Sequence, residues 1–291
     1  MTMPRIGVSL PTFGPHAGPA AVVSVAQATE RLGFHSVSAA ERLLLPATPG
    51  WRNEFGLPES PVFDSIEMLT WAAAHTERIR LGTAVVNPLF QPPIVLARRL
   101  ATLDQLSGGR LDVGLGQGWL PEEFTAVGVP LSRRGAGFEE HVAALRSCWG
   151  PDPVEHDGQW CRIPRSFVGP KPFNGDLPVL IGAGSRVAIQ RAARLGAGVI
   201  AAVWDWDVTH TELQWYRGAG GAGPVVLRMA RRWAGEELRT VIASFVSTAL
   251  DDLDAAASIG ADEVHWDLNL SELDPRQQVD ALEAFATALA R

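Results

Sequence analysis

Residues 110–119 read RLDVGLGQGW, an apolar run that passes directly into a glycine-rich turn. A glycine-rich turn between a strand and a helix is where many proteins hold a phosphate. The dinucleotide pattern G-x-G-x-x-G is not completed, because its third glycine comes one place early, at Gly118, and Trp119 stands in its position. The stretch therefore predicts a strand with an unusual turn at its carboxyl end, and the number of similar units decides the fold.

Seven further apolar runs rich in β-branched residues occur along the chain, at 5–10, 35–40, 79–86, 178–184, 197–204, 224–230 and 262–268. Their apolar character on both faces is typical of buried parallel strands. Eight such units predict one (β/α)₈ TIM barrel over residues 1–291, with inserts near 43–63 and 150–176 over the carboxyl ends of the strands. The insert at 154–164, VEHDGQWCRIP, reads as a hairpin around Asp157-Gly158.

Amphipathic helices are predicted between the strands. The pattern at 93–107 ends before Gly108 and directs four leucines inward: Leu96, Leu100, Leu103 and Leu106. The alternative architecture is a pair of Rossmann-like halves, supported by PVLIGAGSRVAI at 178–189 and by Asp205 after the next strand. Val187 at the third glycine position argues against it.

The bulk composition limits the partners. A net charge of −7 without a long basic run argues against nucleic acid. No stretch approaches the roughly 20 apolar residues of a membrane span, so a cytoplasmic protein without a membrane partner is expected. Cys148 and Cys161 are expected to be reduced thiols, and no metal-binding spacing is found.

Two glycine-rich strand ends are candidate cofactor sites. The backbone after the fifth strand could bind a phosphate at a helix N-terminus, through Gly182, Ala183, Gly184, Ser185 and Arg186, with Arg191 adding charge. A capping serine after a tight turn is the alternative. After the fourth strand, Gly116 and Gly118 would let a flat ring approach the backbone, with Trp119 as its wall. A turn whose tryptophan packs under a loop is the alternative there.

Charged residues end the second and the eighth strands. Glu41 and Arg42 could contact a substrate or a cofactor, or could form an ion pair that holds the loop. His265 and Asp267 alternate on one strand, so they share a face. His265 is a candidate acid or base if that face is the barrel interior near the mouth.

These motifs resemble the luciferase-like monooxygenase family of flavin- and deazaflavin-dependent barrels. The resemblance rests on residues 79–88 (IRLGTAVVNP), on SGGRLDVGLGQGWLPEEF at 107–124, on the hairpin at 154–160 and on 169–200. It implies a ring held over the strand ends by Ala84, Val85 and Asn87, with a cis peptide between the first two, and by Gln117, Gly118 and Trp119. It also implies a phosphate at Gly184, Ser185 and Arg186, and a homodimer.

The nearest branch is similar to proteins assigned to the deazaflavin coenzyme F420. It implies hydride transfer to or from a small substrate, which the aromatic residues Phe13, Trp51, Phe90, Trp119, Trp204 and Trp206 suggest is apolar or aromatic. Alcohol- and sugar-phosphate-oxidising members place an Asp-His pair where this chain has Glu41-Arg42, so those substrates are not expected. An FMN-dependent monooxygenase and a non-catalytic barrel are the alternatives.

Overall fold

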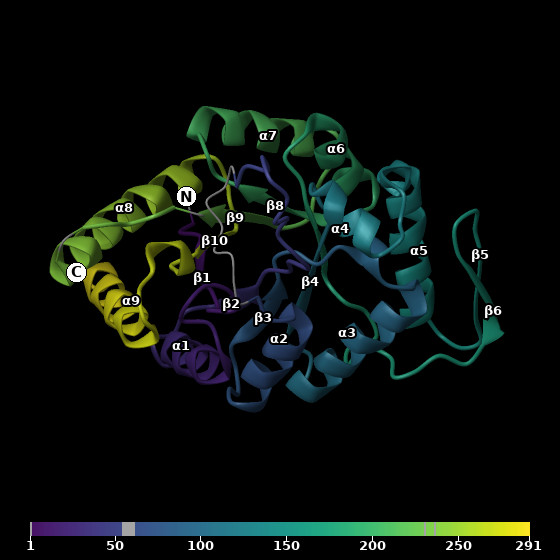
Figure 1. Ribbon diagram of the computed structural model, residues 1–291, viewed down its shortest axis with the longest axis horizontal. Coiled ribbons are helices and arrows are strands. Elements are labelled where there is room, and N and C mark those ends of the chain that lie inside the picture. The colour runs from purple at the N-terminus through teal and green to yellow at the C-terminus, as the bar shows by residue number, and fades with distance from the viewer. Residues whose placement is uncertain (1, 54–61, 230, 236) are drawn as a thin grey trace.

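The computed structural model describes residues 2–53, 62–229, 231–235 and 237–291. Eight parallel strands close into a barrel in the order β1-β10-β9-β8-β7-β4-β3-β2 (Figure 1). They are β1 (Arg5–Ser9), β2 (Ser36–Ala39), β3 (Arg80–Thr83), β4 (Leu111–Gly116), β7 (Val179–Gly182), β8 (Gly198–Ala202), β9 (Val225–Met229) and β10 (Glu263–Trp266). This confirms the predicted (β/α)₈ fold. The last residue of the predicted seventh strand, Ala230, lies outside the described residues.

The helices form a ring outside the barrel (Figure 1). They are α1 (Pro19–Arg31), α2 (Ser65–Ala74), α3 (Pro93–Ser107), α5 (Ala136–Trp149), α6 (Arg186–Arg194), α7 (Trp206–Gly218), α8 (Leu238–Ser258) and α9 (Pro275–Leu289), and the short α4 (Pro121–Ala126) follows β4. Asp205, the acidic residue that favoured a Rossmann half, accepts a hydrogen bond from the Val208 backbone N–H and caps α7. The closed barrel shows that the Rossmann alternative was wrong.

One predicted core residue is misplaced. Leu96, Leu100 and Leu103 of α3 are buried, but Leu106 is 64% exposed. At about 3.6 residues per turn, the buried stripe continues through Ser107 rather than Leu106. Gly108 follows the helix in the left-handed conformation, with φ of 70°, as expected for a helix-ending glycine.

The predicted hairpin is present as β5 (Val154–Asp157) and β6 (Arg162–Ser166), which form a separate antiparallel pair beside α5 (Figure 1). Glu140 of α5 holds its turn, because its carboxylate accepts the backbone N–H groups of Gln159, Trp160 and Cys161 at 2.8–2.9 Å. Of the other insert, near 43–63, residues 54–61 lie outside the described part of the chain.

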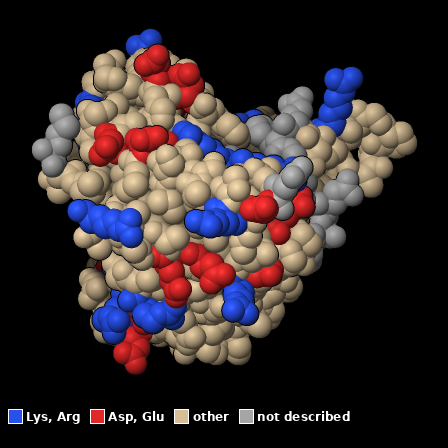
Figure 2. Space-filling model, turned by 90° about the vertical axis from the view of Figure 1, so that its left-hand side faces the viewer, with Lys and Arg blue, Asp and Glu red and all other residues tan. Residues whose placement is uncertain are grey.

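The cysteines and the charged residues of the surface are the next features. Cys148 and Cys161 are both free thiols. Lys, Arg, Asp and Glu side chains are interspersed on the face shown in Figure 2. Among the described residues, no helix has the length and apolar character that crossing a membrane requires.

Candidate active site

The end of β3 passes across the barrel mouth next to β4 and β7. The peptide bond between Ala84 and Val85 is cis, as the family resemblance implied. The Val85 side chain fills the space that two glycines leave open. A Cβ on Gly116 would lie 2.3 Å from Val85 Cγ2, and one on Gly182 would lie 3.0 Å from Val85 Cγ1. The strand-end glycines therefore leave the space that the Val85 side chain fills.

The glycine at 118 has a similar role. It has φ of +65°, and a Cβ there would lie 2.7 Å from Asn87 Nδ2 and 3.1 Å from the Phe124 ring. Side chains of this chain occupy the spaces that a Cβ would take at Gly116 and Gly118, and the approach of a ring to this backbone stays a prediction. The glycines bring Val85 and Asn87 close to the β4 backbone.

Two buried amide donors at this mouth lack partners. Asn87 Oδ1 accepts the Leu89 backbone N–H, but Asn87 Nδ2 has no hydrogen-bond partner among the described residues. Gln117 Nε2 is in the same situation. A buried donor without an acceptor costs about 1–3 kcal/mol, so such a pair indicates a place for a bound acceptor. Flavin and deazaflavin rings carry carbonyl oxygens of this kind along one edge, so the residues present fit such a group.

Glu41 lies beside Asn87, one of these two amide donors. Its Oε2 accepts the Asn87 backbone N–H at 2.7 Å. Burial, helped by the nearby charges of Asp64 and Glu123, raises the pKa of Glu41 to about 7, against the opposing effect of the hydrogen bond from Asn87. Glu41 can therefore gain or lose a proton near neutral pH.

Arg42 is held in place on two sides. Its guanidinium lies 4.9 Å from the centre of the Trp119 ring and 3.6 Å from Glu123 Oε1. The same Glu123 oxygen accepts the Leu43 backbone N–H at 2.8 Å, so the ion pair that orders this loop is present. Glu123 is buried, although it lies in the first turn of α4.

Trp119 borders a cleft of about 400 Å³ beside the insert after β2. The side chain is 43% exposed, so it is a wall of the mouth rather than a buried packing residue. The cleft is lined by Gly50, Trp51, Arg52, Trp119, Leu120, Pro121 and Glu122. Two of the six aromatic residues expected at the mouth thus face one cleft, whereas Phe90 packs edge-on against Phe124 at 5.1 Å.

The candidate phosphate site lies between β7 and α6. Ser185 caps α6 by accepting the Ala188 backbone N–H at 3.4 Å, and Gly184, Ser185 and Arg186 are exposed. A Cβ at Gly184 would meet nothing within 4 Å. The Arg186 guanidinium lies 5.7 Å from the centre of the Trp215 ring. Arg191 was expected to add charge here, but it is buried in an ion pair with Glu139 at 2.7 Å.

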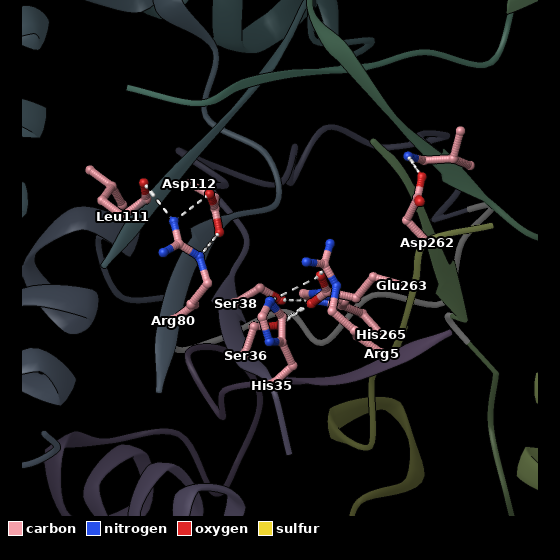
Figure 3. Close-up of polar contacts among 11 residues, drawn as sticks. Arg5, His35, Ser36, Ser38, Arg80, Leu111, Asp112, Asp262, Glu263 and His265 are labelled. Atoms are coloured by element: carbon pink, nitrogen blue, oxygen red, sulfur yellow. Dashed lines mark hydrogen bonds and ion pairs between the residues drawn. The ribbon is translucent and has the colours of Figure 1, made fainter. Parts of the chain in front are cut away.

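His265 lies deeper in the barrel than Glu41. Its Nε2 lies 2.7 Å from Glu263 Oε1 and 3.0 Å from Ser36 Oγ, and its Nδ1 lies 3.0 Å from Ser38 Oγ (Figure 3). Ser36 and Glu263 are the first residues of β2 and β10, so this cluster is at the N-terminal half of the barrel. The structure therefore does not bring His265 to Glu41 and Arg42.

The partners of His265 were not found from the sequence. The polar residues of HSVSAA and DEVHWDL alternate within otherwise apolar strands, which is the signal for a polar inner face. That β2 and β10 meet across β1 becomes visible only once the barrel has closed.

The sequence pattern of the luciferase-like monooxygenase family matches residues 2–287. The chain belongs to this family. Members of the family are F420- or flavin-dependent oxidoreductases and monooxygenases, and the chain is an enzyme of this kind with a deazaflavin or flavin cofactor.

Individual relatives include both types. The protein Rv0953c of Mycobacterium tuberculosis is 31% identical over 278 residues, which cover 92% of each chain. The F420-dependent glucose-6-phosphate dehydrogenase of Nocardia farcinica is 32% identical over 189 residues, which cover 63% of this chain and 53% of that one. The monooxygenase RslO1 of Streptomyces bottropensis superposes with a TM-score of 0.74 at 25% identity over 98% of both chains.

Proposed function

We propose that this luciferase-like family member is an F420-dependent oxidoreductase that moves a hydride between the deazaflavin and a small apolar or aromatic substrate. One observation carries the binding of a flavin-type ring: two buried amide donors, Asn87 Nδ2 and Gln117 Nε2, lack partners in the described structure beside the Ala84–Val85 segment. The identity with the F420-dependent dehydrogenase supports F420 as the cofactor.

The chain's own residues hold and orient the cofactor. Val85, Asn87, Gln117 and Trp119 would hold the ring, with the amide groups of Asn87 and Gln117 as hydrogen-bond donors to its carbonyl oxygens. The exposed backbone of Gly184, Ser185 and Arg186 takes the phosphate at the N-terminus of α6, where the helix dipole favours an anion. When bound, the deazaflavin supplies a carbon centre that accepts or donates a hydride.

Glu41 takes up or releases the proton that accompanies the transfer of the hydride. With its pKa raised to about 7, its carboxyl group can carry a proton at pH 6 and release it at pH 8. Arg42 is fixed by Glu123 and Trp119, so it presents a constant positive charge next to Glu41. These two residues stand where alcohol- and sugar-phosphate-oxidising relatives have an Asp-His pair, which supports a different substrate class.

The cleft between Trp51 and Trp119 supports an apolar or aromatic substrate. Its volume of about 400 Å³ is near the lower end of the range for small-molecule sites, about 300–1,000 Å³. Flat indole walls favour planar apolar groups by stacking. We propose Trp119→Ala as the probe of this wall. This substitution is expected to weaken substrate binding at least fivefold. Unaltered binding and rate would show that the Trp119 side chain only packs against its neighbours.

A second candidate function is an FMN-dependent monooxygenase that reacts reduced flavin with O₂. The superposition on the monooxygenase RslO1 over 98% of both chains favours it. The same donors and the same helix N-terminus would serve either ring.

The decisive experiment is a titration of the purified protein with F420 and, separately, with FMN, followed by fluorescence quenching. Micromolar binding of F420 with at least tenfold weaker binding of FMN would support the proposal. The reverse preference would favour the monooxygenase. Binding of neither would contradict both, and would favour the non-catalytic barrel.

We also propose a homodimer, which the family resemblance implies. Sedimentation equilibrium at micromolar concentration should then give twice the mass of the chain. A single species with the mass of one chain would contradict it.

A further inference from the structure

The barrel interior opens at the N-terminal face, where Pro178, Gly196 and Pro224 line the entrance. A cavity of about 530 Å³ lies inside it, reaching from Arg5, His35 and Asp112 at the N-terminal ends of the strands to Ala84 and Arg228 towards the mouth. TIM-barrel interiors are usually filled by layers of bulky branched side chains. Here the inward positions include Gly82, which lines the cavity and where a Cβ would meet nothing closer than 3.7 Å. This interior space lies below the candidate cofactor site.

A column of polar groups runs along the inside of the barrel, and its lower members, Ser38, Glu263 and His265, line the cavity. On β10 and just after it, Glu263, His265 and Asp267 alternate, so all three face inward. His265 reaches across β1 to Ser36 and Ser38 of β2, because Gly7 has no side chain in between (Figure 3). A Cβ on Gly7 would lie only 2.4 Å from His265 Nε2.

The column continues towards the mouth through β1. Ser9 is the next inward residue after Gly7, and its buried hydroxyl has no partner among the described residues. Ser9 pairs with Ser38, and Val8 pairs with Trp266, so the same register sets Ser9 beside Asp267. A buried hydroxyl without a protein partner indicates bound water. Asp267 in turn forms an ion pair with Arg228 at 2.5 Å.

The lower end of the column is set up for proton exchange. Burial alone would raise the pKa of Glu263, but hydrogen bonds from His265 and Ser36 and the charge of His265 lower it to about 2. The ionised Glu263 therefore accepts the Nε2 proton of His265, which leaves Nδ1 free to exchange a proton with the Ser38 hydroxyl.

Other charged groups also surround this pair. Arg5 of β1 lies 3.4 Å from Glu263 Oε2, and His35, which precedes β2, lies 3.8 Å from the same atom. Arg228 of β9 is paired in register with His265. Arg80 and Asp112 form an ion pair at 2.6 Å on the other side of the cavity (Figure 3).

We propose that His265, Ser38, Ser9 and Asp267, together with water in the cavity and with Glu263 holding His265, form a proton route from the N-terminal face of the barrel to the cofactor site. The route rests on the proposed function. A reduced deazaflavin gives up one hydride and one proton, and the substrate takes up one of each. Only the hydride passes directly, so both protons move through carriers. Each carrier in the route releases one proton as it takes another and ends unchanged, whereas Glu263 stays ionised and only orients His265. None of these residues touches the substrate.

The first test is the water itself. A high-resolution crystal structure of the protein without cofactor should show ordered water that links Ser9, Ser38 and Asp267. A dry cavity, or one filled by a side chain, would overturn the route whatever the cofactor proves to be. This test is independent of the proposed function.

The second test uses His265→Ala with bound F420 and sodium dithionite. Dithionite is oxidised to sulfite and supplies two electrons but no hydride, so both protons on the reduced ring come from protein or water. The variant is expected to bind F420 within twofold of the natural protein and to reduce it at least tenfold more slowly. Added imidazole should restore the rate, and a series of methylimidazoles should do so in the order of their pKa values. A structural filler would not follow that order.

The matched control is His141→Ala, which removes another buried histidine, on α5 and outside the column. It should leave the reduction rate within twofold. If His265→Ala fails to fold, Ser38→Ala takes its place, with Ser38→Thr expected to recover the rate because it keeps the hydroxyl. A rate equal to that of the control, or rescue that ignores pKa, would overturn the route. Failure of the natural protein to bind F420 would instead remove the proposed function, and the route would fall with it.

Discussion

Glu41 combines a buried carboxyl group with a neutral-range pKa, and both properties come from the same surroundings. The side chain is sequestered at the barrel mouth, with Asp64 and Glu123 nearby and one hydrogen bond from the Asn87 backbone. Its charge is therefore held at a cost to the folded state. A group placed in this way is poised for proton transfer rather than for stability.

The cost of Glu41 should be visible in the pH dependence of stability. A carboxyl group whose pKa is about 7 in the folded protein and about 4.5 when unfolded loses stability as pH rises between these values. Glu41→Gln should therefore leave the free energy of unfolding nearly unchanged at pH 4. At pH 8 it should raise that free energy by up to about 3 kcal/mol. Denaturant unfolding at the two pH values measures this.

The control for Glu41 is Glu122→Gln, which changes an exposed carboxylate in α4. It should shift the free energy of unfolding by less than about 0.5 kcal/mol at both pH values. An equal gain for Glu41→Gln at pH 4 and pH 8 would show that its ionisation is not the cause.

Gly116 sets the position of Val85, so a single methyl group should disturb the ring surface. Gly116→Ala would place its Cβ 2.3 Å from Val85 Cγ2 and displace that side chain. Affinity for the cofactor should fall at least tenfold, as measured by fluorescence titration. Gly82→Ala is the matched control, since its Cβ would meet nothing closer than 3.7 Å. Equal affinities of the two variants for the cofactor would show that Gly116 does not affect cofactor binding.

At the scale of elements, the N-terminus of α6 offers a test of phosphate binding. Arg186→Glu puts a negative charge beside the exposed backbone of Gly184 and Ser185. Cofactor affinity should weaken more than tenfold, because two like charges then face each other. Arg194→Glu makes the same change at the other end of the helix and should have less than a twofold effect on the titration. If both variants bind equally well, the phosphate lies elsewhere.

The sequence predicts the strands and helices better than the contacts between them. All eight strand patterns correspond to strands, because buried parallel strands are apolar on both faces and end in turns. The placement of Val85 against Gly116 could not be read from the chain, since it depends on how the ends of β3 and β4 meet. The prediction that Leu106 is buried was wrong for a simpler reason. The leucine at this position does not follow the helical period, so its side chain lies on the exposed face of α3.

Charged residues were the least predictable part of the site. Arg191 looked available for a phosphate until α5 supplied Glu139 as its partner. His265 looked like an acid at the mouth, but the register of β1 and β10 places it lower. An ion pair or a hydrogen bond depends on two residues distant in sequence, and only the assembled barrel brings them together.

For the whole molecule, β1 pairs with β10 to close the barrel, and α9 packs against α1 and α8 on the outside. Phe285 of α9 is fully buried, and its ring contacts those of Phe34, Phe245 and Trp266 at 5.2–6.0 Å between centres. Phe285→Ala should lower the free energy of unfolding by about 3–5 kcal/mol, as measured by chemical denaturation.

The matched control for Phe285 is Phe167→Ala, which removes a phenylalanine that is 86% exposed. It should change the free energy of unfolding by less than about 0.5 kcal/mol. A small loss for Phe285→Ala would mean that the first and last helices are held together by other contacts.

The cavity in the barrel also determines how the protein should respond to hydrostatic compression. Pressure unfolds a protein by eliminating internal void, and ordinary domains lose roughly 20–100 mL/mol in this way. If water fills the cavity of about 530 Å³, the barrel contains little void volume. Its volume change on unfolding should then stay in that range. A dry barrel would shrink far more on unfolding and would lose its fold at modest pressures. Glycines that clear a path for water would therefore also make the fold resistant to pressure.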